Sequence, residues 1–226
     1  MIFGRDEMTG TAGTPLNLHT PITGGSWIRH PSIGAGASLV LSGLNSALNL
    51  DGGACAYFIN NAPITSTYRV SARLNFFTDI NSREGIIGRA NPAANTMYWA
   101  RKFPAGGANR QLELLKMIAG FETTLAFVAD GIERTGVLKL DIQASAKRVL
   151  WDDVQKISVA DNDITDAGRA GIRDDSGFPP STDTTGYHYD DFLAEDDSVD
   201  SGGFGAPLMA CGPAGMGGCL TMGVGP

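Results

Sequence analysis

The strongest periodicity in the sequence is an alternation of apolar and polar side chains over residues 68–76. The apolar members share one phase: Tyr68, Val70, Ala72, Leu74 and Phe76. The polar members share the other: Arg69, Ser71, Arg73 and Asn75. Successive side chains of a strand point to opposite faces of a sheet, so this pattern predicts a β-strand with one buried face.

Similar stretches recur and predict further short strands at 38–42, 54–60, 96–103, 136–143, 147–151, 154–159 and 187–193. Residues 110–119 would also suit a helix by propensity, but glycines on both sides confine them to the length of a strand. Gly (30 residues) and Pro (11 residues) are frequent enough to supply many turns. We therefore expect an all-β domain over residues 1–200, built as a two-sheet antiparallel sandwich.

The composition changes at residue 201. Residues 201–226 are rich in Gly, Met and Pro, carry no charge and have no periodicity, which predicts an irregular extended tail and not a membrane-spanning helix. Its apolar side chains predict an interface: Leu208, Met209, Leu220 and Met222. The tail either packs on its own sandwich or lies on a neighbouring subunit. Cys211 and Cys219 could pair with each other in an oxidising setting or cross-link neighbouring chains.

The charge balance and the absence of familiar motifs exclude several functions. Lys and Arg total 17 against 24 Asp and Glu, and this net charge of −7 argues against a nucleic-acid partner. The histidines, His19, His30 and His188, have no Ser, Cys or acidic residue at a catalytic spacing, and the phase of His188 predicts an outward side chain. The sequence has no phosphate loop, dinucleotide fingerprint or zinc-ligand spacing.

Several motifs, taken in order, are similar to a known family. They are the opening at 10–27 (Gly-Thr-Ala-Gly-Thr-Pro-Leu-Asn-Leu-His-Thr-Pro-Ile-Thr-Gly-Gly-Ser-Trp), Gly-Ile-Ile-Gly-Arg at 85–89, Tyr-Trp-Ala-Arg at 98–101, Leu-Glu-Leu-Leu-Lys at 112–116, Thr-Leu-Ala at 124–126, the segment 158–172, and Tyr-Asp-Asp-Phe at 189–192. Their order over about residues 3–195 resembles the concanavalin A-like (laminin-G-like) jelly-roll domains of bacteriophage and bacterial proteins. The resemblance implies two curved antiparallel sheets. It does not select a function, because lectins, glycanases, adhesion modules and virion proteins share this fold.

Aromatic residues are the candidates for glycan binding, because a sugar ring stacks on an exposed aromatic face beside polar side chains. We select Trp151, Tyr98 and Tyr187. Trp151 precedes a turn at Asp152 and Asp153 and is therefore expected to be exposed. The other two tryptophans, Trp27 and Trp99, are expected in the core.

Calcium is the one cofactor for which the sequence offers candidate ligands, because Ca²⁺ prefers oxygen ligands. Candidate ligands are Asp161, Asp163, Asp166, Asp190 and Asp191. The resemblance implies that some members hold structural calcium near the chain ends. The alternative is turn chemistry, in which Asp side chains cap their own backbone.

A glycanase would need two carboxylates on one face of a strand, in a pattern such as Glu-x-Asp-x-x-Glu. The nearest match is Glu-Asp-Asp-Ser-Val-Asp at 195–200, which ends in Asp and follows the last predicted strand. We therefore assign no catalytic residue.

Two functions fit these observations. The first is a non-enzymatic structural protein of a bacteriophage virion, a capsid decoration (cement) or tail component that contacts other virion subunits or copies of itself. The alternative is a carbohydrate-binding module that recognises a surface glycan, in a virion or otherwise in an extracellular or cell-surface setting. A divergent glycanase is a minor alternative.

Overall fold

The regular structure consists almost entirely of strands. A computed structural model describes residues 1–34, 38–78, 83–104, 110–129, 135–176 and 181–197. Its elements are β1 (Ile2–Asp6), the 3-10 helix η1 (Leu16–Leu18), β2 (Trp27–Arg29), β3 (Leu39–Leu41), β4 (Ala47–Asn49), β5 (Gly53–Ile59), β6 (Tyr68–Thr78), β7 (Glu84–Asn91), β8 (Thr96–Pro104), β9 (Arg110–Ile118), β10 (Phe121–Ala129), β11 (Gly136–Ile142), β12 (Ala146–Trp151), β13 (Val154–Ala160), β14 (Arg169–Ser176) and β15 (Gly186–Asp196).

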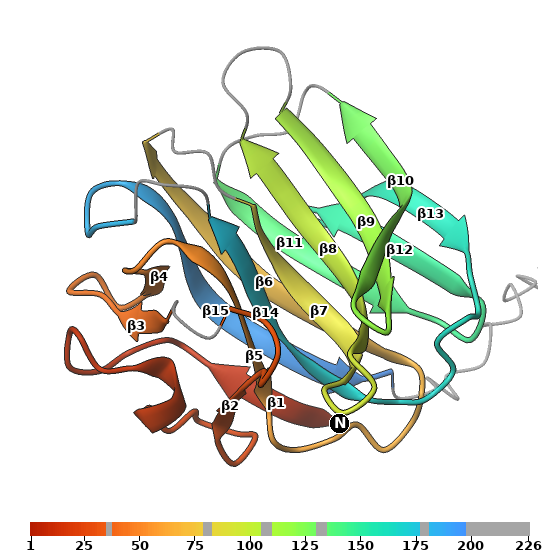
Figure 1. The fold of residues 1–226 in the computed structure, drawn as a ribbon, viewed down its shortest axis with the longest axis horizontal. Helices are drawn as coiled ribbons and strands as arrows, with labels where there is room; N and C mark the ends of the chain where they lie inside the picture. Colours follow the sequence, from red (N-terminus) through yellow and green to blue (C-terminus); the bar gives the residue numbers. More distant parts are fainter. Residues whose placement is uncertain (35–37, 79–82, 105–109, 130–134, 177–180, 198–226) are drawn as a thin grey trace, which may run out of the picture.

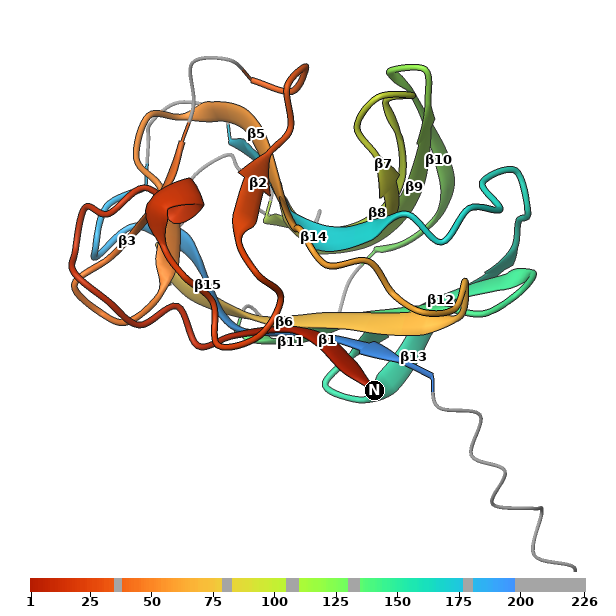
Figure 2. The same cartoon turned by 90° about the horizontal axis from the view of Figure 1, so that it is seen from below.

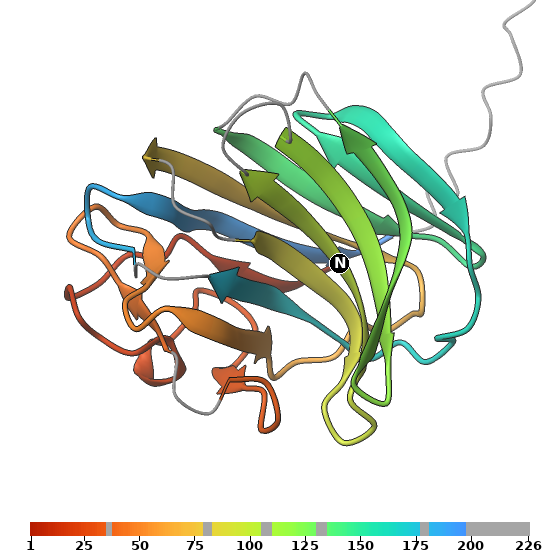
Figure 3. The ribbon, with the colours of Figure 1, turned by 45° about the horizontal axis from the view of Figure 1, so that its top comes forward.

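The strands form two antiparallel sheets that lie in two layers (Figures 1 and 3). The eight-stranded sheet has the order β13-β12-β11-β6-β15-β4-β3, with β1 paired to β15. The seven-stranded sheet has the order β10-β9-β8-β7-β14-β5-β2. Neighbours in both sheets come from distant parts of the chain, as in the pairing of β14 with β5 and β7. The prediction of an all-β, two-sheet antiparallel jelly roll is confirmed.

The predicted tail and the residues assigned to its interface lie outside the described residues, as do Cys211 and Cys219. The residues assigned to the interface are Leu208, Met209, Leu220 and Met222. Among the residues that the structure does describe, none belongs to a helix with the length and apolar character needed to cross a bilayer.

The alternation over residues 68–76 has the consequence expected for β6. Tyr68, Val70 and Leu74 are buried in a core cluster that also contains Tyr98, Leu112 and other residues of the seven-stranded sheet. The opposite face of β6 carries Arg69 and Arg73, which pair with carboxylates at the surface. The core therefore fills the space between the two sheets, and the outer face of β6 is polar. The ambiguous segment 110–119 is also a strand, β9.

His188 differs from the prediction, because its side chain is fully buried. Its Nδ1 is 2.9 Å from the Ser46 hydroxyl, and its Nε2 is 2.9 Å from the carbonyl oxygen of Thr182. The imidazole thus joins Ser46, the residue before β4, to the segment before β15. Burial lowers the pKa of His188, although the nearby backbone groups of Thr182 and Thr185 oppose this shift.

We expect the free energy of unfolding to fall as the pH drops through about 6.5. The unfolded chain then protonates His188, whereas the folded chain does not until a lower pH, so the unfolded state binds more protons. Urea unfolding at about pH 7.5 and at about pH 5.5 measures this difference. His188→Gln should be less stable at the higher pH and should lose less stability on acidification. An equal pH dependence in both proteins would contradict the assignment.

Candidate functional site

The seven-stranded sheet is curved, and its concave face points away from the eight-stranded sheet. In Figure 2, β14 lies lowest in this sheet, with β5 and β2 rising on one side and β7 to β10 rising on the other. Curvature of this kind creates a surface that can surround an elongated ligand. The side chains on this face are therefore the candidates for ligand binding.

One row of side chains crosses the concave face. Directly opposed residues of antiparallel strands have side chains on the same face. The strand registers give the row as Ala56, Arg173, Gly85, Arg101, Glu113 and Phe127. Arg101 is separated by one residue from Trp99, and the intervening Ala100 belongs to the core between the sheets. Trp99 therefore lies on the concave side together with this row.

Trp99 forms the base of an arginine stack. The guanidinium carbon of Arg173 lies 4.0 Å from the centre of the indole ring, and that of Arg101 lies 4.6 Å from it. Both arginines are themselves almost completely buried. Stacking orients a guanidinium and leaves its N–H groups to interact in the plane. The ring is thus covered, and it does not offer a free face to a sugar.

Carboxylates on β9 and β10 neutralise this stack. Arg101 Nε donates to Glu113 Oε2 at 2.5 Å, and Arg173 Nη2 donates to Glu122. His30 closes the β2 side, where burial and the positive charge of Arg173 lower the pKa of its imidazole. The centre of the concave face therefore consists of fixed hydrogen-bonding groups with balanced charge.

A second stack lies on the same sheet, next to the C-terminal part of β14. The guanidinium of Arg83 covers the ring of Phe103 with 4.9 Å between the guanidinium carbon and the ring centre. Arg83 Nη1 also forms an ion pair with Asp175 Oδ2 at 3.5 Å. This arginine is therefore both stacked and charge-paired, like those in the centre.

A pocket of about 810 Å³ opens near the N-terminal end of β14. One wall consists of β2, β5 and adjacent residues, and the other consists of the end of β7 and its turn. The first wall is formed by Ile28, Arg29, Pro31, Phe58 and Ala62, the second by Ala90, Asn91, Pro92 and Ala93, and the remainder by Asp166, Gly168 and Arg169. The size suits a small ligand or a few sugar units.

Buried polar groups hold the segment that carries Asp166 and Gly168. Arg89 is buried and donates to the carbonyl oxygens of Ile164 and Ser66. The Tyr68 hydroxyl donates to the carbonyl oxygen of Ala167 at 2.9 Å. This side of the pocket is therefore fixed to strands β6 and β7 before any ligand binds.

Arg169 is held in place inside the pocket. Its guanidinium carbon lies 5.3 Å from the centre of the Phe58 ring. Its Nη1 donates to Asn60 Oδ1 at 2.8 Å. Within the described part of the chain it forms no ion pair, although Asp166 lines the same pocket.

The aromatic residues selected from the sequence lie in the core instead. The expectation that Trp151 is exposed is wrong, because only 3% of its surface is accessible. Trp151 shares its strand phase with the buried Val149, and Lys102 Nζ lies 4.2 Å from the centre of its ring. Tyr98 and Tyr187 are also fully buried, so none of the three offers a ring to a sugar. Trp27 and Trp99 are buried, as expected.

The candidate calcium ligands do not converge. Lys116 Nζ donates to Asp161 Oδ2 at 2.8 Å and also to Asp163, so an ammonium group takes the place between them. Those two hydrogen bonds raise the pKa of Lys116. Asp166 lines the pocket, whereas Asp190 and Asp191 lie on β15 in the other sheet. Among the described residues, no three His, Cys, Asp or Glu side chains gather as a metal site.

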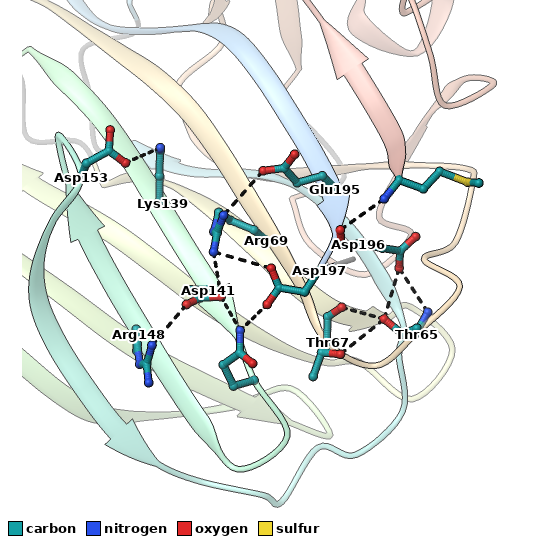
Figure 4. Close-up of polar contacts among 12 residues, drawn as sticks. Thr65, Thr67, Arg69, Lys139, Asp141, Arg148, Asp153, Glu195, Asp196 and Asp197 are labelled. Atoms are coloured by element: carbon teal, nitrogen blue, oxygen red, sulfur yellow. Dashed lines mark hydrogen bonds and ion pairs between the residues drawn. The ribbon is translucent and has the colours of Figure 1, made fainter. Parts of the chain in front are cut away.

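The acidic segment at 195–200 lies on the far side of the molecule, as far as it is described. Figure 4 shows Arg69 of the eight-stranded sheet with ion pairs to Glu195 and to Asp197, the residue after β15. Arg69 also pairs with Asp141, which pairs in turn with Arg148. These ion pairs of 3.6 to 3.8 Å join oppositely charged side chains of neighbouring strands around the buried Asp141 and therefore belong to the structure of the sheet.

Sequence reasoning missed the residues of the concave face, above all Phe58, Arg169 and Phe127. Phe127 is 62% exposed and stands opposite Glu113, so it is the exposed aromatic ring of the cross-strand row. An apolar residue exposed on an edge strand is a usable signal only after the strand order is known.

The comparisons with known proteins place the fold. No protein-family model and no curated protein sequence matches the chain. The carbohydrate-binding module CBM66 from Bacillus subtilis matches with a TM-score of 0.55 at 12% identity, over 86% of this chain and 97% of that one. A β-glucanase from Bacillus licheniformis matches with a TM-score of 0.54 at 10% identity, over 83% and 99%.

A third match is the exoplasmic/lumenal domain of VIP36 in a form bound to Ca²⁺ and Man2, with a TM-score of 0.53 at 8% identity, over 84% of this chain and 88% of that one. Identities this low establish a shared fold and leave the ligand open. The chain therefore has the concanavalin A-like jelly-roll fold.

Proposed function

We propose that this concanavalin A-like sandwich is a carbohydrate-binding domain that holds a saccharide on the concave face of its seven-stranded sheet. The observation that carries the proposal is the pocket of about 810 Å³ beside β14, where a stacked arginine, a carboxylate and apolar walls meet. Saccharides need this combination, because their hydroxyls bind to charged side chains and their ring faces pack on apolar surface.

The similarity to a carbohydrate-binding module and to a sugar-bound lectin domain supports the same proposal. The virion role expected from the sequence has no support in the comparisons.

The domain binds its ligand without transforming it, in this proposal. A glycosidase needs two apposed carboxylates, one of them able to deliver a proton. The central carboxylates of the concave face, Glu113 and Glu122, are each engaged by an arginine. Calcium is also not required in this proposal, because Lys116 already neutralises Asp161 and Asp163. Binding should therefore survive treatment with EDTA.

A larger side chain in the pocket should weaken binding. Ala93 is exposed and lines the pocket, so Ala93→Leu would place a branched side chain in the space of the ligand without disturbing the core. We expect affinity for the best ligand from a glycan array to fall about tenfold or more, which corresponds to about 1.4 kcal/mol. Isothermal titration calorimetry on the purified chain measures this effect.

Ala94→Leu is the matched control. Ala94 is the next residue of the same turn, and it is exposed without lining the pocket. This variant should bind like the unmodified protein. Equal losses in both variants, or none in Ala93→Leu, would refute the location of the site. The absence of binding to any saccharide on the array would refute the function.

A further inference from the structure

Over the described ranges, the arginines that stack on aromatic rings of the concave face form ion pairs with carboxylates, except for Arg169. In the described part of the chain, four arginines stack on aromatic rings of this face: Arg83 on Phe103, Arg101 and Arg173 on Trp99, and Arg169 on Phe58. The first three form ion pairs with Asp175, Glu113 and Glu122. Within the residues that the structure describes, Arg169 pairs with no carboxylate and has the Asn60 side chain as its polar partner.

Arg169, the stacked arginine without an ion pair among the described residues, lines the pocket. Asp166 lines the same cavity, yet its carboxylate makes no ion pair with Arg169. Arg29 lines it too and donates to the carbonyl oxygen of Gly34. The register of Arg29 with Tyr57, a residue of the core between the sheets, directs its side chain away from the concave face, so Arg169 is the cation that the pocket presents to a ligand.

The guanidinium of Arg169 is preorganised for an anion. The ring of Phe58 fixes its plane, and Asn60 holds one of its N–H groups. Its remaining N–H groups form a planar fork that matches the two oxygens of a carboxylate. Little side-chain entropy remains to be lost on binding, which favours a tight contact.

We propose that the saccharide bound in this pocket is acidic, and that Arg169 binds the carboxylate of a uronic acid or similar carboxylated sugar. This inference rests on the proposed function and names its ligand class. Asp166, on the same pocket, accepts hydrogen bonds from the sugar hydroxyls. The apolar walls around Phe58 and Pro92 pack against the ring carbons.

The test compares acidic polysaccharides with the same polymers after chemical reduction of their carboxylates to alcohols. Polygalacturonate, alginate and hyaluronan are the probes, with sulfated dextran as a polyanion lacking carboxylates. The full chain should bind at least one acidic polymer and should bind its carboxyl-reduced form about tenfold more weakly. Arg169→Gln should cause a similar loss for the acidic polymer and leave the affinity for the reduced form unchanged.

Arg83→Gln is the matched control, because it removes the same charge from a stacked arginine of the same face, outside the pocket. It should leave the affinity unchanged. Three results would contradict a carboxylated ligand while leaving saccharide binding intact. They are equal binding to acidic and reduced polymers, equal losses in Arg169→Gln and Arg83→Gln, and equal binding to sulfated dextran. Binding to no saccharide of any kind would overturn the proposed function itself. Unchanged thermal midpoints of both variants confirm that they are folded.

Discussion

Replacing Trp99 with alanine is expected to lower the free energy of unfolding by about 3–5 kcal/mol. The indole is 1% exposed and packs on the concave side of the seven-stranded sheet in a cluster with buried apolar residues such as Ile87 and Leu115. Its removal leaves a cavity and also takes away the ring on which Arg101 and Arg173 stack. Losses of transfer free energy, packing and cation–π attraction therefore add at one position. Urea denaturation monitored by circular dichroism measures the change.

Phe121→Ala serves as the control for this substitution. Phe121 also belongs to the seven-stranded sheet, but its ring is 81% exposed, so its removal should change stability by less than about 0.5 kcal/mol. Trp99→Phe keeps a ring under the arginines and should fall between the two. A loss below about 1 kcal/mol in Trp99→Ala would show that the indole is not packed as described.

Gly171→Ala is expected to cost about 3 kcal/mol or more, because β14 and β5 approach each other too closely for a side chain. A Cβ at this position would lie 2.0 Å from the Tyr57 carbonyl oxygen and 2.7 Å from Phe58 Cα. Both are backbone atoms of the paired strand, so they cannot move aside without breaking the ladder. The same movement would displace Phe58 and hence Arg169. Both stability and saccharide affinity should fall.

Gly43→Ala provides the comparison. A Cβ there would lie 3.3 Å from Asp183 Oδ2, the end of an exposed side chain that can rotate away. Neither glycine has a left-handed backbone, so the two substitutions differ in space and not in conformational cost. Thermal unfolding of the two variants should give a clear loss for Gly171→Ala and a small one for Gly43→Ala. Equal midpoints would contradict the close approach of β14 to β5.

The strands could be predicted because their signal is local. The alternation at 68–76 gives both the existence of β6 and the side that faces the core, and these depend on the chain geometry of a few residues. The strand predicted at 96–103 is likewise observed, as β8. For Trp151 the turn at Asp152 and Asp153 led to the wrong prediction of an exposed ring, because the strand phase that it shares with the buried Val149 decides its burial.

The concave face could not be predicted, because it depends on which strands are neighbours. Arg173 and Arg101 lie on either side of Gly85, although they are far apart in the sequence. Alternation predicts which face of a sheet a side chain occupies, but it does not predict which strand lies beside it. Arg169, Phe58 and Asn60 meet only after β14 has paired with β5. Exposure of Phe127 likewise follows from β10 being an edge strand.

The measurement that tests the central claim most directly is a titration of the isotope-labelled chain with its bound saccharide, followed by backbone amide chemical shifts. We predict that the largest changes occur around the pocket, at Ala62, Ala93 and Arg169. The outer face of the eight-stranded sheet around Asp141 and Arg148 should remain unchanged. Changes centred on that outer face, with the pocket residues unaffected, would contradict binding on the concave face.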